Sequence, residues 1–238
     1  MRRDGAQLVF VGRAHEVQGG NDVHGGYRFD GWYLLAWAPE GGEWKLRLWT
    51  WQRARAPRDG WNDIYADGVG FTHEPNQLLV DAVRGVTPGE ALDLATGQGR
   101  NALYLARQGW RVTGVDIADE GLRQARAAAV ADALPATFVE ADLASWELGV
   151  ARWDLIAMIY TPAEPGWYAR IDRALKPGGL IVIDGWGRGP GGEGDGEPAG
   201  AMAARFPGYE ILVDRVARGV PDWAQDQGWL ARFVARKR

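Results

Sequence analysis

The sequence predicts a doubly wound α/β domain with a mostly parallel sheet, preceded by a smaller antiparallel β region. Beyond about residue 75, short apolar strand patterns alternate with helical patterns, which is typical of parallel strands joined by crossover helices. Six of the 13 tryptophans lie within the first 61 residues, which indicates two regions of different construction. With 46% hydrophobic and 24% charged residues, the 238-residue chain has the composition of a globular protein.

Charge and composition favour a small-molecule or protein partner. The formal net charge is −4 and the sequence pI is near 5.5, so no basic footprint for nucleic acid or an anionic membrane is expected. The chain has no cysteine, which excludes disulfides and thiolate metal sites and permits a reducing, cytoplasmic location. Asp4 and Arg13 interrupt the only stretch that resembles a signal peptide, and no apolar run is long enough to span a membrane.

The first region reads as a three-stranded antiparallel meander. Glycine-rich stretches at 19–22 and 39–42 separate the apolar runs and indicate hairpins. A turn or linker is expected at 57–60, which places the domain boundary between residues 56 and 61. The predicted strands are 7–17, 27–38 and 44–52.

The second region, 61–238, reads as strands and helices in alternation, with seven strands in all. The last two strands have no helix pattern between them, so they are expected to pair antiparallel at the sheet edge. The glycine-rich segment 186–200 is expected to be a mobile loop. The predicted helices are 76–84, 101–108, 118–133 and 164–175, and the predicted strands are 91–95, 111–116, 136–141, 153–160, 180–184, 209–217 and 229–236.

The turn after the strand 91–95 is the most informative segment. Gly97 and Gly99 lack a Cβ, which allows a ligand to approach the backbone and makes positive φ cheap. Free amides at the start of the next helix favour an anionic group. Asp116 ends the following strand, where a carboxylate can accept hydrogen bonds from ribose hydroxyls. The turn and the acid together predict a nucleoside site.

Two ligand classes fit this turn. Gly97, Gly99 and Ala102 match the dinucleotide fingerprint with alanine at its third position, so an NAD-dependent oxidoreductase is one alternative. The other alternative follows from a resemblance that extends over residues 61–238.

Four motifs in order resemble the class I S-adenosylmethionine-dependent methyltransferases. Leu92-Asp-Leu-Ala-Thr-Gly-Gln-Gly-Arg-Asn is similar to that family's first motif, and Gly114-Val-Asp116-Ile to its ribose-binding motif. Ala141-Asp142-Leu143 is similar to the adenine motif, and Leu175-Lys-Pro-Gly-Gly-Leu to the turn into the fifth strand of the family's sheet. The resemblance implies a Rossmann-like seven-stranded sheet and S-adenosylmethionine as cofactor, and the small-molecule branch with tellurite-resistance and thiopurine-type enzymes looks nearest.

The resemblance also implies roles for individual residues. Ala95 departs from the family, which usually has glycine there; if that position needs positive φ, the alanine is strained by about 1 kcal/mol or more. Asp93 and Gly97 would lie at the methionine end and Asp116 at the ribose. The expected cofactor-binding residues are Asp93, Ala95, Gly97, Gly99, Asn101, Asp116, Ile117 against the adenine face, Asp142 at its exocyclic amine and Leu143 beside the ring.

Methyl transfer requires alignment more than a fixed set of catalytic residues, so the acceptor is harder to identify than the cofactor. Acceptor contacts are expected in loops at the carboxyl ends of strands, at Tyr160-Thr161, around Trp186 and in 65–76. Tyr160 is the candidate catalytic residue, positioning the reactants or acting as an aromatic lid. His73 and Glu74 form either a proton-transfer pair or a surface pair.

No metal site is expected, because the histidines near the N-terminus lack ligand spacing. The function predicted is therefore S-adenosylmethionine-dependent methyl transfer to a small molecule. An NAD-dependent oxidoreductase and a protein that binds S-adenosylmethionine without catalysis remain the alternatives.

The N-terminal strands predict a role in association. Residues 32–37 and 43–51 resemble the closing strands of SnoaL-like domains, although the first helices of such domains are missing. Exposed tryptophan faces favour subunit pairing or a roof over the substrate, so we expect a homodimer formed through the meander. Light scattering should therefore show a smaller assembly after deletion of residues 1–55, and an unchanged size would argue against this role.

Overall fold

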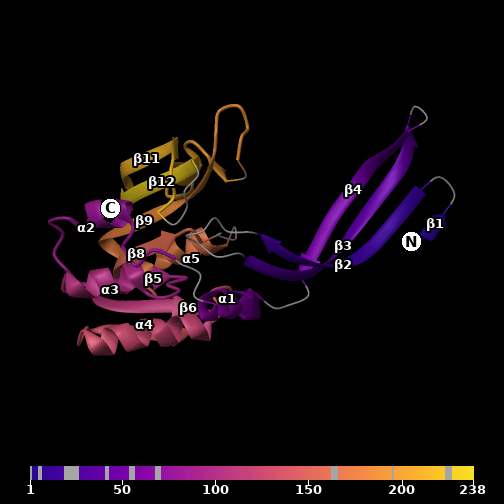
Figure 1. Cartoon of the computed structure of the whole chain (residues 1–238). Helices are drawn as coiled ribbons and strands as arrows, with labels where there is room; N and C mark the ends of the chain where they lie inside the picture. The colour runs from indigo at the N-terminus through magenta and orange to yellow at the C-terminus, as the bar shows by residue number, and fades with distance from the viewer. Residues whose placement is uncertain are drawn as a thin grey trace. The chain divides into compact units, whose positions relative to one another are not determined.

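The computed structural model describes residues 2–4, 7–18, 27–40, 43–53, 57–67, 71–161, 166–194, 196–222 and 227–238. Contacts divide the chain into two compact units, Met1–Gly70 and Phe71–Arg238. Both are drawn in Figure 1. The contact boundary lies later in the chain than the predicted one because a helix, not a linker, follows the N-terminal strands.

The first unit contains an antiparallel sheet in the order β1-β2-β3-β4. The predicted three-stranded meander is confirmed, and a short additional strand, β1, pairs with β2. The side chains of the meander lie almost entirely outside the described part, so the predicted homodimer stays a prediction. The strands are β1 (Arg2–Asp4), β2 (Gln7–Gln18), β3 (Tyr27–Glu40) and β4 (Glu43–Arg53).

Helix α1 (Pro57–Ala66) replaces the turn or linker predicted at 57–60, and that prediction was wrong. Proline is favourable in the first helical turn, where its missing N–H has no helical partner to lose. Asp59 places an acid in that turn, which complements the helix dipole. Trp61 and Tyr65 stack one turn apart, with ring centroids 6.0 Å apart.

The second unit is built on a mostly parallel sheet in the order β11-β12-β9-β8-β5-β6-β7, with β10 paired to β9. The predicted seven-stranded sheet with its antiparallel edge is confirmed, because β12 runs antiparallel to both β9 and β11. The strands are β5 (Glu90–Leu94), β6 (Arg111–Asp116), β7 (Ala136–Glu140), β8 (Trp153–Ile159), β9 (Leu175–Arg188), β10 (Glu197–Pro198), β11 (Glu210–Gly219) and β12 (Gly228–Arg236).

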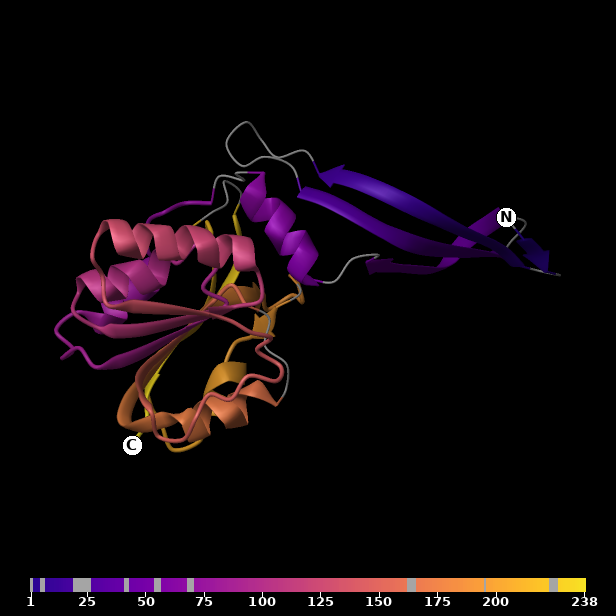
Figure 2. The same cartoon turned by 90° about the horizontal axis from the view of Figure 1, so that it is seen from below.

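Helices cover both faces of this sheet, as Figure 2 shows. One core contains side chains of α2, α3 and α4 with one face of the strands, and the other contains side chains of α5 and α6 with the opposite face. No described helix has both the length and the apolar character needed to cross a membrane. The helices are α2 (Gln77–Val83), α3 (Arg100–Arg107), α4 (Asp119–Ala131), α5 (Trp167–Ala174) and α6 (Ala201–Arg205).

Two segments differ from the sequence-based expectation. Strand β9 starts before and ends after the predicted strand 180–184, because its early residues continue the sheet beside β8 and its late residues pair with β10 and β12. The glycine-rich segment 186–200, expected to be a loop, contributes Glu197 and Pro198 to a parallel pair with β9. Helix α6 was not predicted.

The turn between β5 and α3 contains three left-handed residues. Ala95, Gly97 and Gly99 have φ angles of 55°, 54° and 81°. Such angles cost little for glycine, whereas the Cβ of an L-residue approaches a carbonyl oxygen. Ala95 is therefore strained, as the departure from the family's glycine suggested.

We expect Ala95→Gly to raise the free energy of unfolding by about 0.5–1 kcal/mol. Removing the Cβ relieves about 1–2 kcal/mol of left-handed strain, and the added freedom of the unfolded chain offsets about half of that gain. Urea denaturation followed by circular dichroism measures the difference. Ala127→Gly, an exposed position in the middle of α4, is the matched control and should lose about 1 kcal/mol. A similar loss at both positions would contradict strain at Ala95.

Candidate functional site

The candidate site lies at the carboxyl ends of β5, β6, β8 and β9. In open α/β sheets this edge is where ligands bind, because the loops there diverge and leave a crevice. Three of these strands place a polar or aromatic side chain within one residue of their ends, and β9 places one opposite Ile159, the last residue of β8. In chain order these residues are Asp93, Asp116, Tyr160 and Asp184.

Asp93 is a buried carboxylate beside the glycine turn. Its side chain is 1% exposed, and its Oδ2 accepts a hydrogen bond of 2.6 Å from the Thr96 hydroxyl. Burial raises the pKa of Asp93 from its ordinary 3.8 to about 6, although Thr96 and the positive charge of Arg100 oppose this shift. A buried carboxylate that stays ionised at neutral pH is suited to bind a cationic group, as the predicted methionine end requires.

Asp116 holds the glycine turn to the loop after β6. Its Oδ2 accepts from the amide of Gly97 and its Oδ1 accepts from the amide of Ala118, both at 2.8 Å. Burial raises the pKa of Asp116, and the two amides oppose that shift. Each carboxylate oxygen has a second lone pair, so these backbone bonds leave acceptor capacity for ribose hydroxyls.

The two glycines of the turn serve different purposes. A Cβ at Gly99 would lie 2.9 Å from the Cβ of Ala125 and 3.2 Å from the ring of Phe138. Gly99 therefore allows α3 to pack against α4 and β7, whereas the sequence suggested close approach of a ligand there. Gly97 has the positive φ that the sequence predicted, and its amide donates to Asp116; its contact with a cofactor stays a prediction.

The predicted adenine residues lie on two loops. Ile117 and Leu143 are half-buried, and Asp142 is exposed with its Oδ1 accepting from the amide of Ala144 at 2.9 Å. The other carboxylate oxygen of Asp142 accepts no hydrogen bond from this turn. The arrangement is compatible with the predicted contacts, and nothing in the structure tests them.

Arg170 in α5 fixes this adenine turn and was not predicted. Its guanidinium donates to the carbonyls of Leu143 at 2.8 Å and Ala144 at 3.1 Å, and also to that of Trp146. Three carbonyls pointing at one guanidinium define the path of the turn. No sequence signal identifies Arg170, because its partners are backbone atoms 24–27 residues away.

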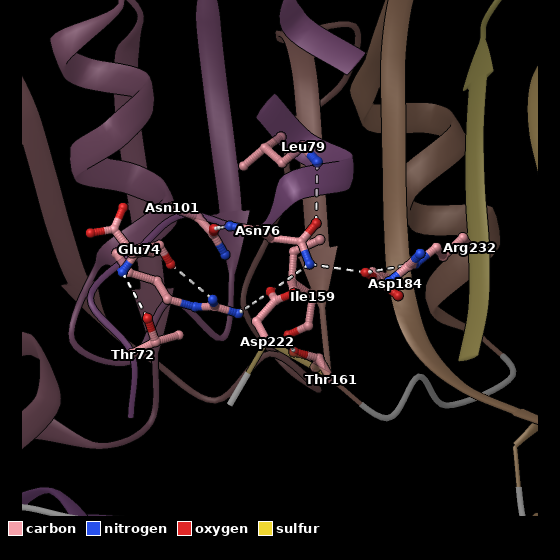
Figure 3. A network of polar contacts seen from close by, with 11 residues as sticks. Thr72, Glu74, Asn76, Leu79, Asn101, Ile159, Thr161, Asp184, Asp222 and Arg232 are labelled. Carbon is pink, nitrogen blue, oxygen red and sulfur yellow. Dashed lines mark hydrogen bonds and ion pairs between the residues drawn. The ribbon is translucent and has the colours of Figure 1, made fainter. Parts of the chain in front are cut away.

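A buried asparagine lies at the centre of the polar network in Figure 3. Asn76 is 0% exposed and caps α2, with its Oδ1 accepting from the amide of Leu79 at 3.1 Å. Its own amide N–H donates to Oδ1 of Asn101 at 2.9 Å, so the predicted site residue Asn101 anchors the entry to α2. The sequence placed the start of a helix at Asn76 but gave no sign of its long-range partners.

The side-chain amide of Asn76 connects two ion pairs. It donates to Oδ2 of Asp184 at 2.9 Å and to Oδ2 of Asp222 at 2.7 Å. Asp222 pairs with Arg100 at 3.0 Å, and Asp184 pairs with Arg232 at 3.4 Å. The two carboxylates and two guanidiniums balance in charge, which lowers the free-energy cost of removing them from water.

Asp184 is the most deeply buried acid of this network, at 1% exposure. Burial and the nearby charge of Asp222 raise its pKa, while the hydrogen bond from Asn76 and the charge of Arg232 lower it. Its Oδ1 has no hydrogen-bond partner among the described residues. Sequence reasoning placed Asp184 at a strand end without assigning it a role.

Tyr160 and Trp186, both predicted at the acceptor side, lie together. Their ring centroids are 5.9 Å apart, and the Tyr160 amide donates to the carbonyl of Asp184 at 2.7 Å. Tyr160 has a φ of 53°, a costly conformation for an aromatic residue and one that is common at functional sites. Burial, together with the charges of Asp184 and Asp222, raises the pKa of its hydroxyl, so the group stays protonated at neutral pH.

The other candidates are less informative. His73 and Glu74 are exposed, and the backbone carbonyl of Glu74 accepts from Arg100 at 3.0 Å. His73 lines a groove on the α3–α4 side together with Gln98, Arg100 and Gln124. The described ranges contain no cluster of three or more His, Asp or Glu side chains that could hold a metal ion, and His24 lies outside those ranges.

Comparison with known proteins finds similarity to methyltransferases. A family model described as "Methyltransferase domain" matches residues 91–179. The ribosomal protein L11 methyltransferase of Thermus thermophilus is 32% identical over 142 residues, covering 57% of this chain and 54% of that protein. An uncharacterized methyltransferase of Synechocystis is 30% identical over 122 residues, covering 48% and 55%. The chain spans about half the length of these two relatives.

Solved structures show the same fold at low identity. TehB from Haemophilus influenzae aligns with a TM-score of 0.61 and 16% identity over 98% of this chain and 90% of that chain. The 1,6-didemethyltoxoflavin-N1-methyltransferase of Burkholderia thailandensis, solved with its substrate and S-adenosylhomocysteine, aligns with a TM-score of 0.58 and 19% identity over 85% and 95%. Residues 91–179 of this chain are thus similar to a methyltransferase domain, and the chain shares the fold of these two solved structures.

Proposed function

We propose that the protein transfers the methyl group of S-adenosylmethionine to a small-molecule acceptor. The observation that carries the proposal is the pair of buried carboxylates, Asp93 and Asp116, on either side of a left-handed glycine turn. Burying an ionised acid lowers the stability of the folded protein, so two buried acids at this edge of the sheet support a ligand whose polar groups would offset that cost.

The residues of this edge fit the cofactor group by group. Asp93 offers a negative charge to an ammonium, and Asp116 retains lone pairs for two hydroxyls. Ile117 and Leu143 offer apolar surface to a flat ring, and Asp142 offers an acceptor to an amine. A zwitterionic nucleoside thus finds a complementary partner for each of its polar groups.

The chain contributes alignment and exclusion of water. The sulfonium of the cofactor supplies an already activated methyl group, so direct displacement needs the reactants in line and little else. Asp93 and Asp116 would fix the two ends of the cofactor through buried hydrogen bonds. Tyr160 and Trp186 would form an aromatic wall at the acceptor side, and the strained backbone of Tyr160 would direct its ring.

Two features support a small acceptor. The polar groups beside Tyr160 are buried and balanced in charge, which suits a compact ligand better than an extended polyanion. The net charge of −4 supplies no attraction for nucleic acid. The ribosomal protein L11 methyltransferase is a relative named for a protein acceptor, and this makes a protein acceptor the competing possibility.

Transfer of a labelled methyl group distinguishes these acceptors. Purified protein is incubated with methyl-labelled S-adenosylmethionine and a cell extract separated into small molecules, protein and RNA. We expect label in the small-molecule fraction, which is then resolved against a panel of phenols, amines, thiols and metalloid oxyanions. Label confined to protein or RNA would contradict a small acceptor, and no label anywhere despite cofactor binding would indicate a non-catalytic protein.

Cofactor affinity should depend on pH through Asp93. Its pKa of about 6 means that the carboxylate is ionised at pH 7–8 and becomes protonated at lower pH. Loss of the charge that binds the ammonium should weaken S-adenosylhomocysteine binding below pH 6 by up to about tenfold per pH unit. Isothermal titration calorimetry between pH 5 and 8 measures this dependence.

Asp93→Asn should bind weakly at pH 7.5 and show a flatter profile. Asp132→Asn, an exposed substitution at the end of α4, should keep both the affinity and the pH dependence of the natural protein. If Asp93→Asn instead keeps the full pH dependence, Asp93 does not contact the cofactor.

A further inference from the structure

Opposite charges flank the glycine turn. Asp93 is the residue before the last of β5, and Arg100 is the first residue of α3, immediately after Gly99. Burial raises the pKa of Asp93, and the positive charge of Arg100 offsets part of that rise, so the two charged groups act on each other across the turn. The turn therefore carries one anion and one cation, which is the charge pattern that recognises the amino-acid end of a zwitterion.

The guanidinium of Arg100 already donates hydrogen bonds to two groups of the protein. One guanidinium nitrogen donates to the carbonyl of Glu74, and the other donates to Oδ2 of Asp222, both at 3.0 Å. The two side chains of the ion pair are only 15% and 17% exposed. Asp222, labelled in Figure 3, lies just beyond β11, so its carboxylate reaches Arg100 from a distant part of the chain.

We propose that Arg100 receives the α-carboxylate of the cofactor and that Asp222 competes for the same guanidinium in the ligand-free protein. The inference rests on the proposed function, because it assumes that S-adenosylmethionine binds at this turn. Asp222 presents to Arg100 the same chemical group as the amino-acid end of the cofactor. Its contact would therefore act as an internal competitor that lowers cofactor affinity.

The hydrogen bonds around Asp222 make such an exchange feasible. When Arg100 turns toward the cofactor, Asp222 keeps the 2.7 Å hydrogen bond from Asn76. Arg100 in turn can keep the carbonyl of Glu74 with its other nitrogen, because a guanidinium has five donors. Neither partner is left as an isolated buried charge, which would otherwise cost several kcal/mol.

The exchange would also connect the two substrates. Asp222 and Asp184 share the amide of Asn76, and both charges act on the hydroxyl of Tyr160. Release of Asp222 from Arg100 on cofactor binding would change the polar surroundings of Tyr160, where the acceptor is proposed to bind. Asp222 is thus a positioning residue rather than a catalytic one.

The test compares two ligands that differ in one group. Isothermal titration calorimetry measures binding of S-adenosylhomocysteine and of its decarboxylated analogue, 5′-deoxy-5′-(3-aminopropylthio)adenosine. We expect Asp222→Asn to tighten S-adenosylhomocysteine binding by about 3–10-fold and to leave the analogue unchanged, because only the first ligand competes with Asp222. Arg100→Gln should bind both ligands with similar affinity, whereas the natural protein should prefer S-adenosylhomocysteine.

A second, exposed Arg–Asp pair supplies the controls. Arg84 and Asp81 pair at 2.7 Å at the end of α2, and Arg84→Gln and Asp81→Asn should leave both affinities unchanged. Thermal unfolding checks that each variant folds. If Arg100→Gln does not fold, the comparison of the two ligands with Asp222→Asn still tests the competition. Equal effects of Asp222→Asn on the two ligands, or weaker binding of S-adenosylhomocysteine alone, would overturn the competition. A natural protein that binds neither ligand would overturn the proposed function itself.

Discussion

The carboxylate of Asp116 is the contact on which the candidate site depends. It joins the amides of Gly97 and Ala118, and so fixes the loops after β5 and β6 to each other. Without this double acceptor, two buried amides would lack partners, and the left-handed turn would lose its support. Each oxygen of the same carboxylate retains a lone pair, which would be available to ribose hydroxyls. Asp116 thus holds the turn in place and also provides acceptors for the proposed ligand.

The buried acids of the candidate site lower the stability of the folded protein. The pKa of Asp93 in the folded protein, about 6, lies above its ordinary 3.8. Ionisation of this group therefore weakens the folded state as the pH rises from about 4 to about 6, and the cost persists at neutral pH. The pKa of Asp116 and that of Asp184 shift in the same direction, again because of burial. A cationic or hydrogen-bonding ligand would recover part of this cost, which is how a fold can hold charge ready for a substrate.

The network around Asn76 gives the acceptor side its shape. Its amide, its carbonyl oxygen and its backbone N–H all have partners, in β9, in α2 and α3, and beyond β11. Segments that are more than 100 residues apart in the chain therefore meet at one buried side chain. Such a saturated group is rigid, because displacing any one segment leaves a buried donor or acceptor without a partner. The proposed coupling between the glycine turn and the residues around Tyr160 would act through this shared side chain.

The sequence by itself determined the α/β fold class, the glycine turn and the acid at the end of β6. These features depend on local patterns, namely apolar periodicity, glycine at left-handed positions and a fixed spacing along the chain. It also located the strain at Ala95. The helix at Pro57–Ala66 was missed, since proline and glycine were taken as turn residues although the first helical turn accepts proline.

Only the tertiary structure decided the partners of Asn76, Asp184, Asp222 and Arg170. Their long-range hydrogen bonds join residues 24–146 positions apart, and those of Arg170 end on backbone carbonyls, which carry no residue identity. The role of Gly99 was likewise settled by the packing of α4 and β7 against it. Local pattern fixes which elements form, whereas the pairing of distant polar groups depends on how those elements pack, and packing has no signature along a single chain.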